Sequence, residues 1–404
     1  MRAVPDAPND KEASMPTIVY LIHGMGCGTS DGSPRPQGDT WTDGTRAAIQ
    51  WIADTFKLAR PIFLDPIPAL PPAGSEKPDA IWIVPISYYS VFDEFRATAK
   101  TREGAVKGIA PALLVDAQIT ALSGKDFAWV NCLDVLLWWA DTAQTRTRAS
   151  ATILNAITQA DGLARSIPGA KVRRILISHS LGNAAATAAV RHLGTNDPVW
   201  PSSGGFQFWY TLANVAPFLF QTEDVYSPPL LPGRAGTMVQ RMYNVRHEAD
   251  PIPWLLPWRH WDPGNAQAPW TADWATQKDL GNFRFFETQG VFGLSGRKPP
   301  EITDVHGFTN YLLAPDIAMR LAAAMRGAAF SQSELDALDL TTARNKLAAL
   351  SCLKNSTALE KLKQTTAAYI GELPVPPIGV PTSGGWLNRL LRAADILVDA
   401  RKGC

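Results

Sequence analysis

The segment RRILISHSLGNAA, residues 173–185, runs from an apolar, strand-like stretch into two serines around a histidine and then into an alanine-rich pattern. Small residues flank Ser180, as they must where a strand turns sharply into a helix and the two elements pack closely. The segment predicts a buried strand, a tight turn at Ser180 and a helix. Whether the Ser180 hydroxyl is a nucleophile or part of an ordinary strand-to-helix junction depends on partners elsewhere in the chain.

Other apolar runs of the same kind recur along the chain, and helical patterns lie between several of them, such as residues 40–59 after the first run and 181–193 after Ser180. This alternation predicts an α/β fold whose mostly parallel sheet is covered by helices on both faces. The other predicted strands, each bounded by Gly, Pro or Asp, are 17–24, 80–89, 205–214, 239–247 and 283–289.

The strand pattern places one large domain between short or helical additions. Some 80 mainly helical residues separate the strand at 80–89 from the strand before Ser180, more than a crossover helix needs, so part of this segment is predicted to be an insertion. The expected organisation is a flexible N-terminus at 1–15, a domain at 16–330 and a C-terminal helical extension at 331–404. Within the domain we expect a helical insertion or cap at about 92–165 and cleft loops at 215–235 and 251–280.

Composition excludes several classes of function. The content is 46% hydrophobic and 19% charged, as in a globular protein, and the net charge of +1 gives no reason to expect a nucleic-acid partner. The four cysteines show no CxxC or Cys/His spacing, so neither a disulfide framework nor a metal site is predicted, and no cofactor motif is found.

The N-terminus lacks the apolar core of a signal peptide, and no window offers the roughly 18 unbroken apolar residues of a membrane span. We therefore expect a soluble protein that is cytoplasmic, or secreted without a cleavable signal.

A second motif, VYLIHGMGCG at 19–28, also ends a predicted strand. Acyl transfer develops an oxyanion that needs two backbone N–H donors, one from a loop after an early strand and one from the residue after the nucleophile. Met25 and Leu181 occupy those two positions, with His23 and Gly24 supporting the loop. An ordinary Gly-rich turn is the alternative, because the motif lacks the Lys-Ser/Thr ending of a phosphate-binding loop and any convincing dinucleotide fingerprint.

These two motifs, in this order, resemble those of the αβ-hydrolase superfamily, and the resemblance covers roughly residues 15–325. The family's usual G-x-S-x-G is here S-H-S-L-G, so Ser178 stands in place of the first glycine and adds a Cβ and a hydroxyl where bulk would clash. The resemblance implies a nucleophile, an acid and a histidine in that chain order, with the acid after a late strand and the histidine after the last one.

The family's acid position falls on Asp250, in the sequence EADPIPWL after the strand at 239–247. Pro251 fixes a turn that helps hold the carboxylate toward the edge of the sheet. Glu223 and Asp224, after the strand at 205–214, are the competing carboxylates.

His306, in EITDVHGFTNYL, is expected to be the general base. His260 is the alternative, but it comes too soon after Asp250 and before the last predicted strand, which favours a pocket or packing role. The expected catalytic set is therefore Ser180, Asp250 and His306, with His306 moving the proton and Asp250 fixing its tautomer.

Tryptophans crowd the segment after Asp250, and an apolar, Pro-rich segment follows Asn214. Both follow strand ends, where a substrate cleft forms in such folds, so they suggest an apolar acyl chain or a lipid surface, although for any single Trp packing against the protein is the simpler explanation. The substrate-contact residues expected from these segments are Trp254, Trp258, Trp261 and Phe218.

The sequence thus predicts a serine hydrolase of carboxylic esters, similar to lipases, phospholipases and esterases that act in lipid metabolism. The same residues would serve an amidase or thioesterase, and a non-catalytic binding relative is the alternative from another class. Similarity to bacterial secreted phospholipase effectors points to a bacterial source. A terminal helix from Trp386 has an apolar face and several arginines, and it either docks on the protein or makes peripheral contact with an anionic membrane.

Overall fold

The structure is a computed structural model of the chain. It describes residues 16–24, 40–75, 77, 79–92, 94, 134, 135, 137, 138, 144–168, 171–196, 200, 204–220, 230, 237–245, 250–254, 306–313, 315–338, 361, 364–368, 392, 393 and 396.

A single six-stranded sheet forms the centre of the fold, and every strand pair in it is parallel. The predicted α/β class with a parallel sheet is confirmed. Five predicted strands are found within one to three residues of their expected ends, whereas the run at 283–289 lies outside the described residues. The strands are β1 (Thr17–Ile22), β2 (Ile62–Phe63), β3 (Ile81–Ile86), β4 (Arg173–His179), β5 (Phe206–Leu212) and β6 (Val239–Val245), in the spatial order β2-β3-β1-β4-β5-β6.

The strand order reverses at β1. From β1 the chain goes to β2 at the edge of the sheet, comes back to β3 beside β1, and then crosses to the other side of β1 to form β4, β5 and β6. The register aligns the carboxyl ends of the strands, because Ile22 lies opposite both Ile86 and Ser178, and Leu212 lies opposite both His179 and Val245. Ligands of open α/β sheets bind outside the carboxyl ends near such a reversal, so this edge is where a site is expected.

The central strands are buried along their whole length. Every residue of β1 and β4 is buried, which matches the nearly continuous runs of Ile, Val and Leu in both strands. Strands that read this way need cover on both faces, since alternate side chains point to opposite sides. Large aromatic side chains complete the core, among them Trp82, Trp138, Trp200 and Trp209.

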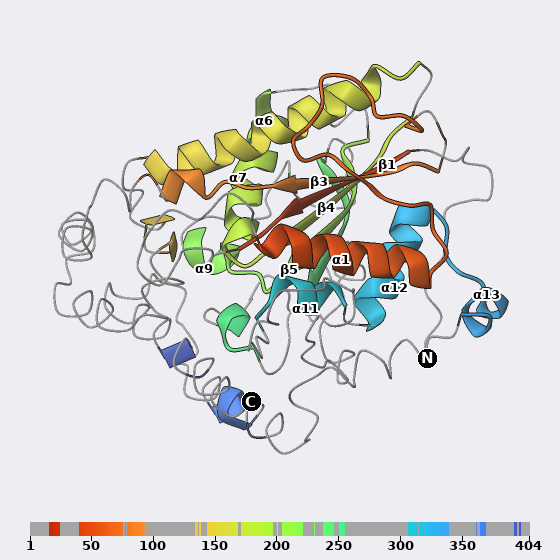
Figure 1. Cartoon of the computed structure of the whole chain (residues 1–404). Helices are drawn as coiled ribbons and strands as arrows, with labels where there is room; N and C mark the ends of the chain where they lie inside the picture. The colour runs from red at the N-terminus through yellow and green to blue at the C-terminus, as the bar shows by residue number, and fades with distance from the viewer. Residues whose placement is uncertain are drawn as a thin grey trace.

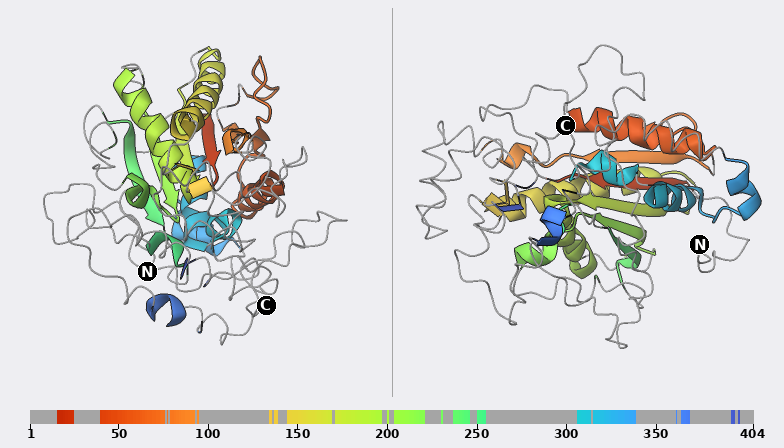
Figure 2. Two further views of the ribbon diagram at one scale, coloured as in Figure 1. Left: turned by 90° about the vertical axis from the view of Figure 1, so that its left-hand side faces the viewer. Right: turned by 90° about the horizontal axis from the view of Figure 1, so that it is seen from below.

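The helices form two packed groups. One group contains α6, which contacts α7 and β3, and α7, which also contacts β1, β4 and α9. The other contains α1, which contacts α11 and α12, and α12, which contacts β1. Figures 1 and 2 show α1 on one side of the strands and α6 and α7 on the other. Their bounds are α1 (Thr40–Thr55), α6 (Thr145–Arg165), α7 (Leu181–Asn196), α9 (Ala216–Phe220), α11 (Phe308–Leu312), α12 (Pro315–Arg326) and α13 (Gln332–Asp336), with the 3-10 turn η2 (Ile252–Trp254).

The predicted additions are described only in part. The expected insertion at 92–165 ends in α6, which packs on the body of the fold, and the extension from 331 begins with α13. Farther on, Ala393 and Ile396 are buried. Within the described residues, no helix is both long enough and apolar enough to span a membrane.

Candidate active site

Ser180 occupies the turn between β4 and α7 in a backbone conformation that is rare for a residue with a side chain. Its φ is 52°, and its N–H donates to the Leu212 carbonyl of β5 at 2.9 Å. A left-handed serine that is fully buried persists only where its surroundings hold it, and such residues cluster at functional sites. The turn places the Ser180 side chain at the carboxyl edge of the sheet.

A histidine and an aspartate complete a hydrogen-bonded chain with Ser180. His306, two residues before α11, has its Nε2 at 2.8 Å from Ser180 Oγ and its Nδ1 at 2.8 Å from Asp250 Oδ2. Asp250 follows β6 and is fully buried, and its Oδ1 accepts the Ile252 N–H at 3.0 Å. The chain supplies an oriented imidazole between a hydroxyl and a carboxylate, as base-assisted nucleophilic attack requires.

The His23-Gly24 loop after β1 lies against the Ser180 turn. A Cβ added to Gly24 would sit 2.9 Å from the His179 carbonyl oxygen and closer still to the Cβ of Ser180, so only glycine fits there without a shift. A Cβ on Gly182 would similarly crowd the carbonyl oxygens of Ile22 and His23. The two glycines allow the β1 loop and the start of α7 to approach each other closely.

Leu181 is the first residue of α7 and is fully buried. The N–H groups of a helix's first turn have no partner within the helix, so the Leu181 N–H is suited to an oxyanion beside Ser180. Met25, the other expected donor, lies outside the described residues.

Two tyrosines after β3 hold His23 in place. The Tyr88 hydroxyl donates to the His23 carbonyl at 3.0 Å, and the Tyr89 hydroxyl is hydrogen-bonded to His23 Nδ1. The rings of His23 and Tyr89 also pack together, with centroids 4.0 Å apart. His23 is buried and tied to the neighbouring strand's end, which fits a supporting role for its side chain in the loop.

Ser178, the residue that departs from the G-x-S-x-G pattern, links two buried side chains. The Trp209 Nε1–H donates to Ser178 Oγ at 2.7 Å, and Ser178 Oγ donates to Asn183 Oδ1 at 2.6 Å. The Asn183 amide in turn donates to the carbonyls of Ser180 at 3.1 Å and Leu212 at 2.8 Å. The added hydroxyl therefore belongs to a network that braces the turn, since buried polar groups that all find partners rigidify their site.

His179 packs beside His306 but takes no part in the hydrogen bonds that link Ser180, His306 and Asp250. Its ring centroid lies 4.8 Å from that of His306 and 5.4 Å from that of Phe308. Burial, followed by the charge of His306, lowers the pKa of His179 well below its usual value. His179 is therefore a neutral neighbour of His306 at ordinary pH.

No family model, curated protein or solved structure matches the chain.

The structure places six of the candidate residues together at one edge of the sheet: Ser180, Asp250, His306, Leu181, His23 and Gly24. The backbones of Trp254 and Phe218 lie in η2 and α9, which follow Asp250 and β5 at that same edge. The remaining candidates and competitors, Trp258, Trp261, His260, Glu223 and Asp224, lie outside the described residues.

Sequence reasoning missed several residues of the site: Tyr88, Tyr89, Asn183, Trp209, and Tyr311, whose hydroxyl donates to Asp250 Oδ2 at 2.7 Å. Tyr88 and Tyr89 follow β3, and they reach His23 only because β3 pairs with β1, which the sequence did not indicate. Asn183 is an amide in the first turn of an otherwise alanine-rich helix, which was a usable signal. Tyr311 and Trp209 resemble core aromatics, and the sequence contains nothing that marks them.

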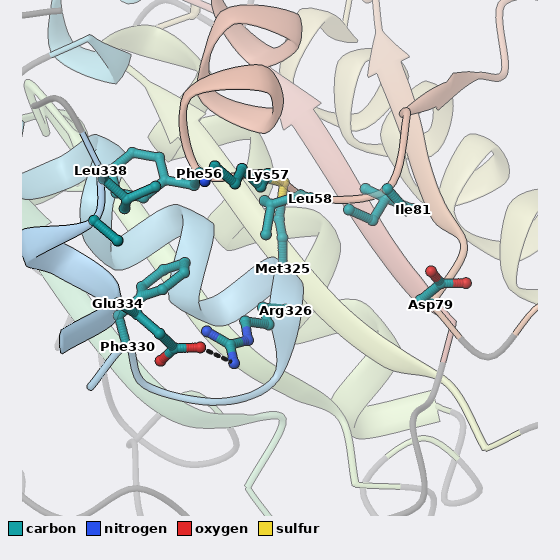
Figure 3. Close-up of a pocket in the computed structure, with 12 residues that line it drawn as sticks. Phe56, Lys57, Leu58, Asp79, Ile81, Met325, Arg326, Phe330, Glu334 and Leu338 are labelled. Atoms are coloured by element: carbon teal, nitrogen blue, oxygen red, sulfur yellow. Dashed lines mark hydrogen bonds and ion pairs between the residues drawn. The ribbon is translucent and has the colours of Figure 1, made fainter. Parts of the chain in front are cut away.

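A cavity of about 420 Å³ lies at the opposite, amino edge of the sheet, between the end of α1, the start of β3, the end of α12 and α13 (Figure 3). At its rim Arg326 pairs with Glu334, and hydrogen bonds from Arg326 and Ser331 lower the pKa of Glu334 to about 2. None of its lining residues belongs to the triad or its supports.

Proposed function

We propose that the chain is a serine hydrolase that cleaves carboxylic esters through an acyl-enzyme intermediate. The observation that carries the proposal is the Ser180–His306–Asp250 chain, with both hydrogen bonds at 2.8 Å and a left-handed Ser180 at the carboxyl edge of a parallel sheet. Any one of these features occurs in structural roles. Their combination is what nucleophilic catalysis by serine needs.

We also propose the finer fold assignment, a doubly covered αβ-hydrolase fold. It is supported by the two helical groups, by the burial of β1 and β4 along their length, and by the chain order of Ser180, Asp250 and His306.

In the first half-reaction, Ser180 Oγ attacks the ester carbonyl carbon while His306 Nε2 takes the hydroxyl proton. Asp250 accepts the His306 Nδ1–H, which fixes the tautomer and stabilises the imidazolium. The tetrahedral oxyanion accepts hydrogen bonds from the Leu181 and Met25 N–H groups. When the carbon–oxygen bond breaks, the alcohol leaves with the proton from His306.

The second half-reaction repeats these steps with water. His306 Nε2 takes a proton from the water as its oxygen attacks the acyl carbon, and the acid leaves as Ser180 Oγ regains the proton. Substrate exchange requires solvent access to Ser180, whose side chain is buried in this structure.

The proposed substrates are esters of medium or long acyl chains, including lipids. Support comes from the tryptophan-rich segment that begins at η2 and the apolar segment that begins at α9, because both start at the edge where Ser180 lies. Loops that follow strand ends line the ligand clefts of such folds. An apolar lining would favour acyl chains over small polar groups.

The experiment is a comparison of kcat/KM for p-nitrophenyl esters from acetate to dodecanoate, followed by phospholipids, with detergent controls for micelles. Each buried methylene contributes up to about 0.8 kcal/mol, so four of them raise kcat/KM by as much as about two orders of magnitude. Trp258→Ala and Trp261→Ala should flatten this profile and leave the short esters unchanged. A native profile that falls steadily from acetate would refute the lipid assignment, and turnover no greater than that of Ser180→Ala would refute the hydrolase.

A further inference from the structure

Asp250 receives more hydrogen bonds than orientation of His306 requires. Its Oδ1 accepts the Ile252 N–H at 3.0 Å, whereas its Oδ2 accepts both His306 Nδ1–H at 2.8 Å and the Tyr311 hydroxyl at 2.7 Å. Two donors from the same short segment, one just before α11 and one within it, therefore meet on a single carboxylate oxygen.

The hydrogen bond from Tyr311 to Asp250 is buried, which strengthens its electrostatic effect on the carboxylate. Asp250 and Tyr311 are both fully buried, and a hydrogen bond from a hydroxyl to a carboxylate is stronger than one between neutral groups. A donor on Oδ2 draws negative charge away from the His306 Nδ1–H on the same oxygen. The imidazolium form of His306 is consequently less stabilised than it would be beside a carboxylate without Tyr311.

We propose that Tyr311 is a positioning residue for Ser180, His306 and Asp250. The Tyr311 hydroxyl keeps Asp250 Oδ2 directed at His306 Nδ1 and reduces the negative charge on that oxygen, so that His306 remains an unprotonated base at lower pH. The inference rests on the proposed function, because it concerns the same reaction. It assigns Tyr311 no contact with substrate.

The groups around His306 allow its protonation to be distinguished from that of its neighbours. The titratable and polar groups that face it include Asp250, Ser180, His179 and, across Asp250, Tyr311. Burial holds the pKa of His179 well below its usual value, so His179 stays neutral in the pH range of the test. A change in the acidic limb of the activity profile thus reports on His306.

The test is the dependence of kcat/KM on pH, between about pH 5 and pH 9, for the native protein and Tyr311→Phe with a short p-nitrophenyl ester. Removing the hydroxyl returns negative charge to Oδ2, which favours the protonated imidazole. We expect the acidic limb to move to higher pH by about one unit, so that activity on that limb falls roughly tenfold at fixed pH. A smaller loss at the alkaline plateau is expected from the looser carboxylate.

Tyr20→Phe is the matched control. Tyr20 is also buried, on β1, but its hydroxyl has no hydrogen-bond partner, so its removal should leave the profile unchanged. Placing 3-fluorotyrosine at position 311 reverses the perturbation, because fluorine makes the phenol a stronger donor, and the acidic limb should then move to lower pH. This second variant decides the matter if Tyr311→Phe fails to fold.

Each outcome is decisive. Opposite shifts of the acidic limb for Phe and 3-fluorotyrosine at position 311, with Tyr20→Phe unchanged, support the inference. If the acidic limbs of both position-311 variants coincide with the native one, the inference is wrong, even where the rate falls uniformly at every pH. Tyr311 is then a residue of the core, and the proposed hydrolase function is unaffected. A native protein without turnover above that of Ser180→Ala overturns the proposed function and this inference together.

Discussion

Replacing Ser180 with alanine is expected to reduce ester turnover to the background rate, a loss of roughly 10⁶-fold in kcat. Ser180 Oγ lies 2.8 Å from His306 Nε2, the nitrogen that would take its proton. Without Oγ no acyl-enzyme forms, and the oriented imidazole has nothing to activate except water. The measurement is the rate of p-nitrophenyl ester hydrolysis at saturating substrate.

A matched control is Ser75→Ala. Ser75 is also a buried serine, but its Oγ has no hydrogen-bond partner, so turnover should stay at the native rate. Thermal unfolding should show that Ser180→Ala is folded and about as stable as the native protein, because alanine keeps the Cβ and backbone contacts of Ser180 and loses only the hydrogen bond of Oγ to His306. Substantial turnover by a folded Ser180→Ala variant would contradict the assignment of the nucleophile.

His306→Ala is expected to lower kcat/KM by roughly 10⁴-fold or more while the protein stays folded. Its imidazole is the only described group that bridges Ser180 and Asp250, so the variant retains a hydroxyl with no base and a buried carboxylate with fewer donors. The measurement is kcat/KM on the same ester, together with the unfolding temperature.

His192→Ala, an exposed histidine on α7, is the control and should match the native protein. His260→Ala, in the tryptophan-rich segment, should alter apparent substrate affinity far more than rate. If the effects of His306→Ala and His260→Ala are exchanged, His306 is not the base.

The local pattern of the sequence was enough to predict most of the sheet. The runs that became β1 and β4 each contain an uninterrupted apolar stretch at their centre, IVYLI in β1 and ILI in β4, which is typical of strands buried on both faces. β2 was missed because two residues are too short to show a period, and Ile62 and Phe63 form a strand only because they pair with β3. Strand order was not predicted, since it depends on contacts far apart in the sequence.

The residues of the candidate site likewise fall into those that the sequence predicted and those that it did not. Ser180, Asp250 and His306 could be found because each follows a predicted strand in the order that the resemblance implies. The residues that orient them could not, since Tyr311 and Trp209 reach the site only through tertiary packing and have the composition of any core. Ser178 was expected to crowd the turn. In the structure its hydroxyl instead makes hydrogen bonds with Trp209 and Asn183, which help to hold the turn in place.

The central claim, that Ser180 is an activated nucleophile, is tested most directly by reaction with a fluorophosphonate probe followed by mass-spectrometric mapping of the modified peptide. An activated serine displaces fluoride and forms a stable phosphonyl adduct whatever its natural substrate. The account predicts one adduct, on the peptide that carries Ser180, formed quickly in the native protein, slowly in His306→Ala and not at all at that peptide in Ser180→Ala. An unlabelled native protein, or equal labelling of the native protein and Ser180→Ala at another serine, would contradict it.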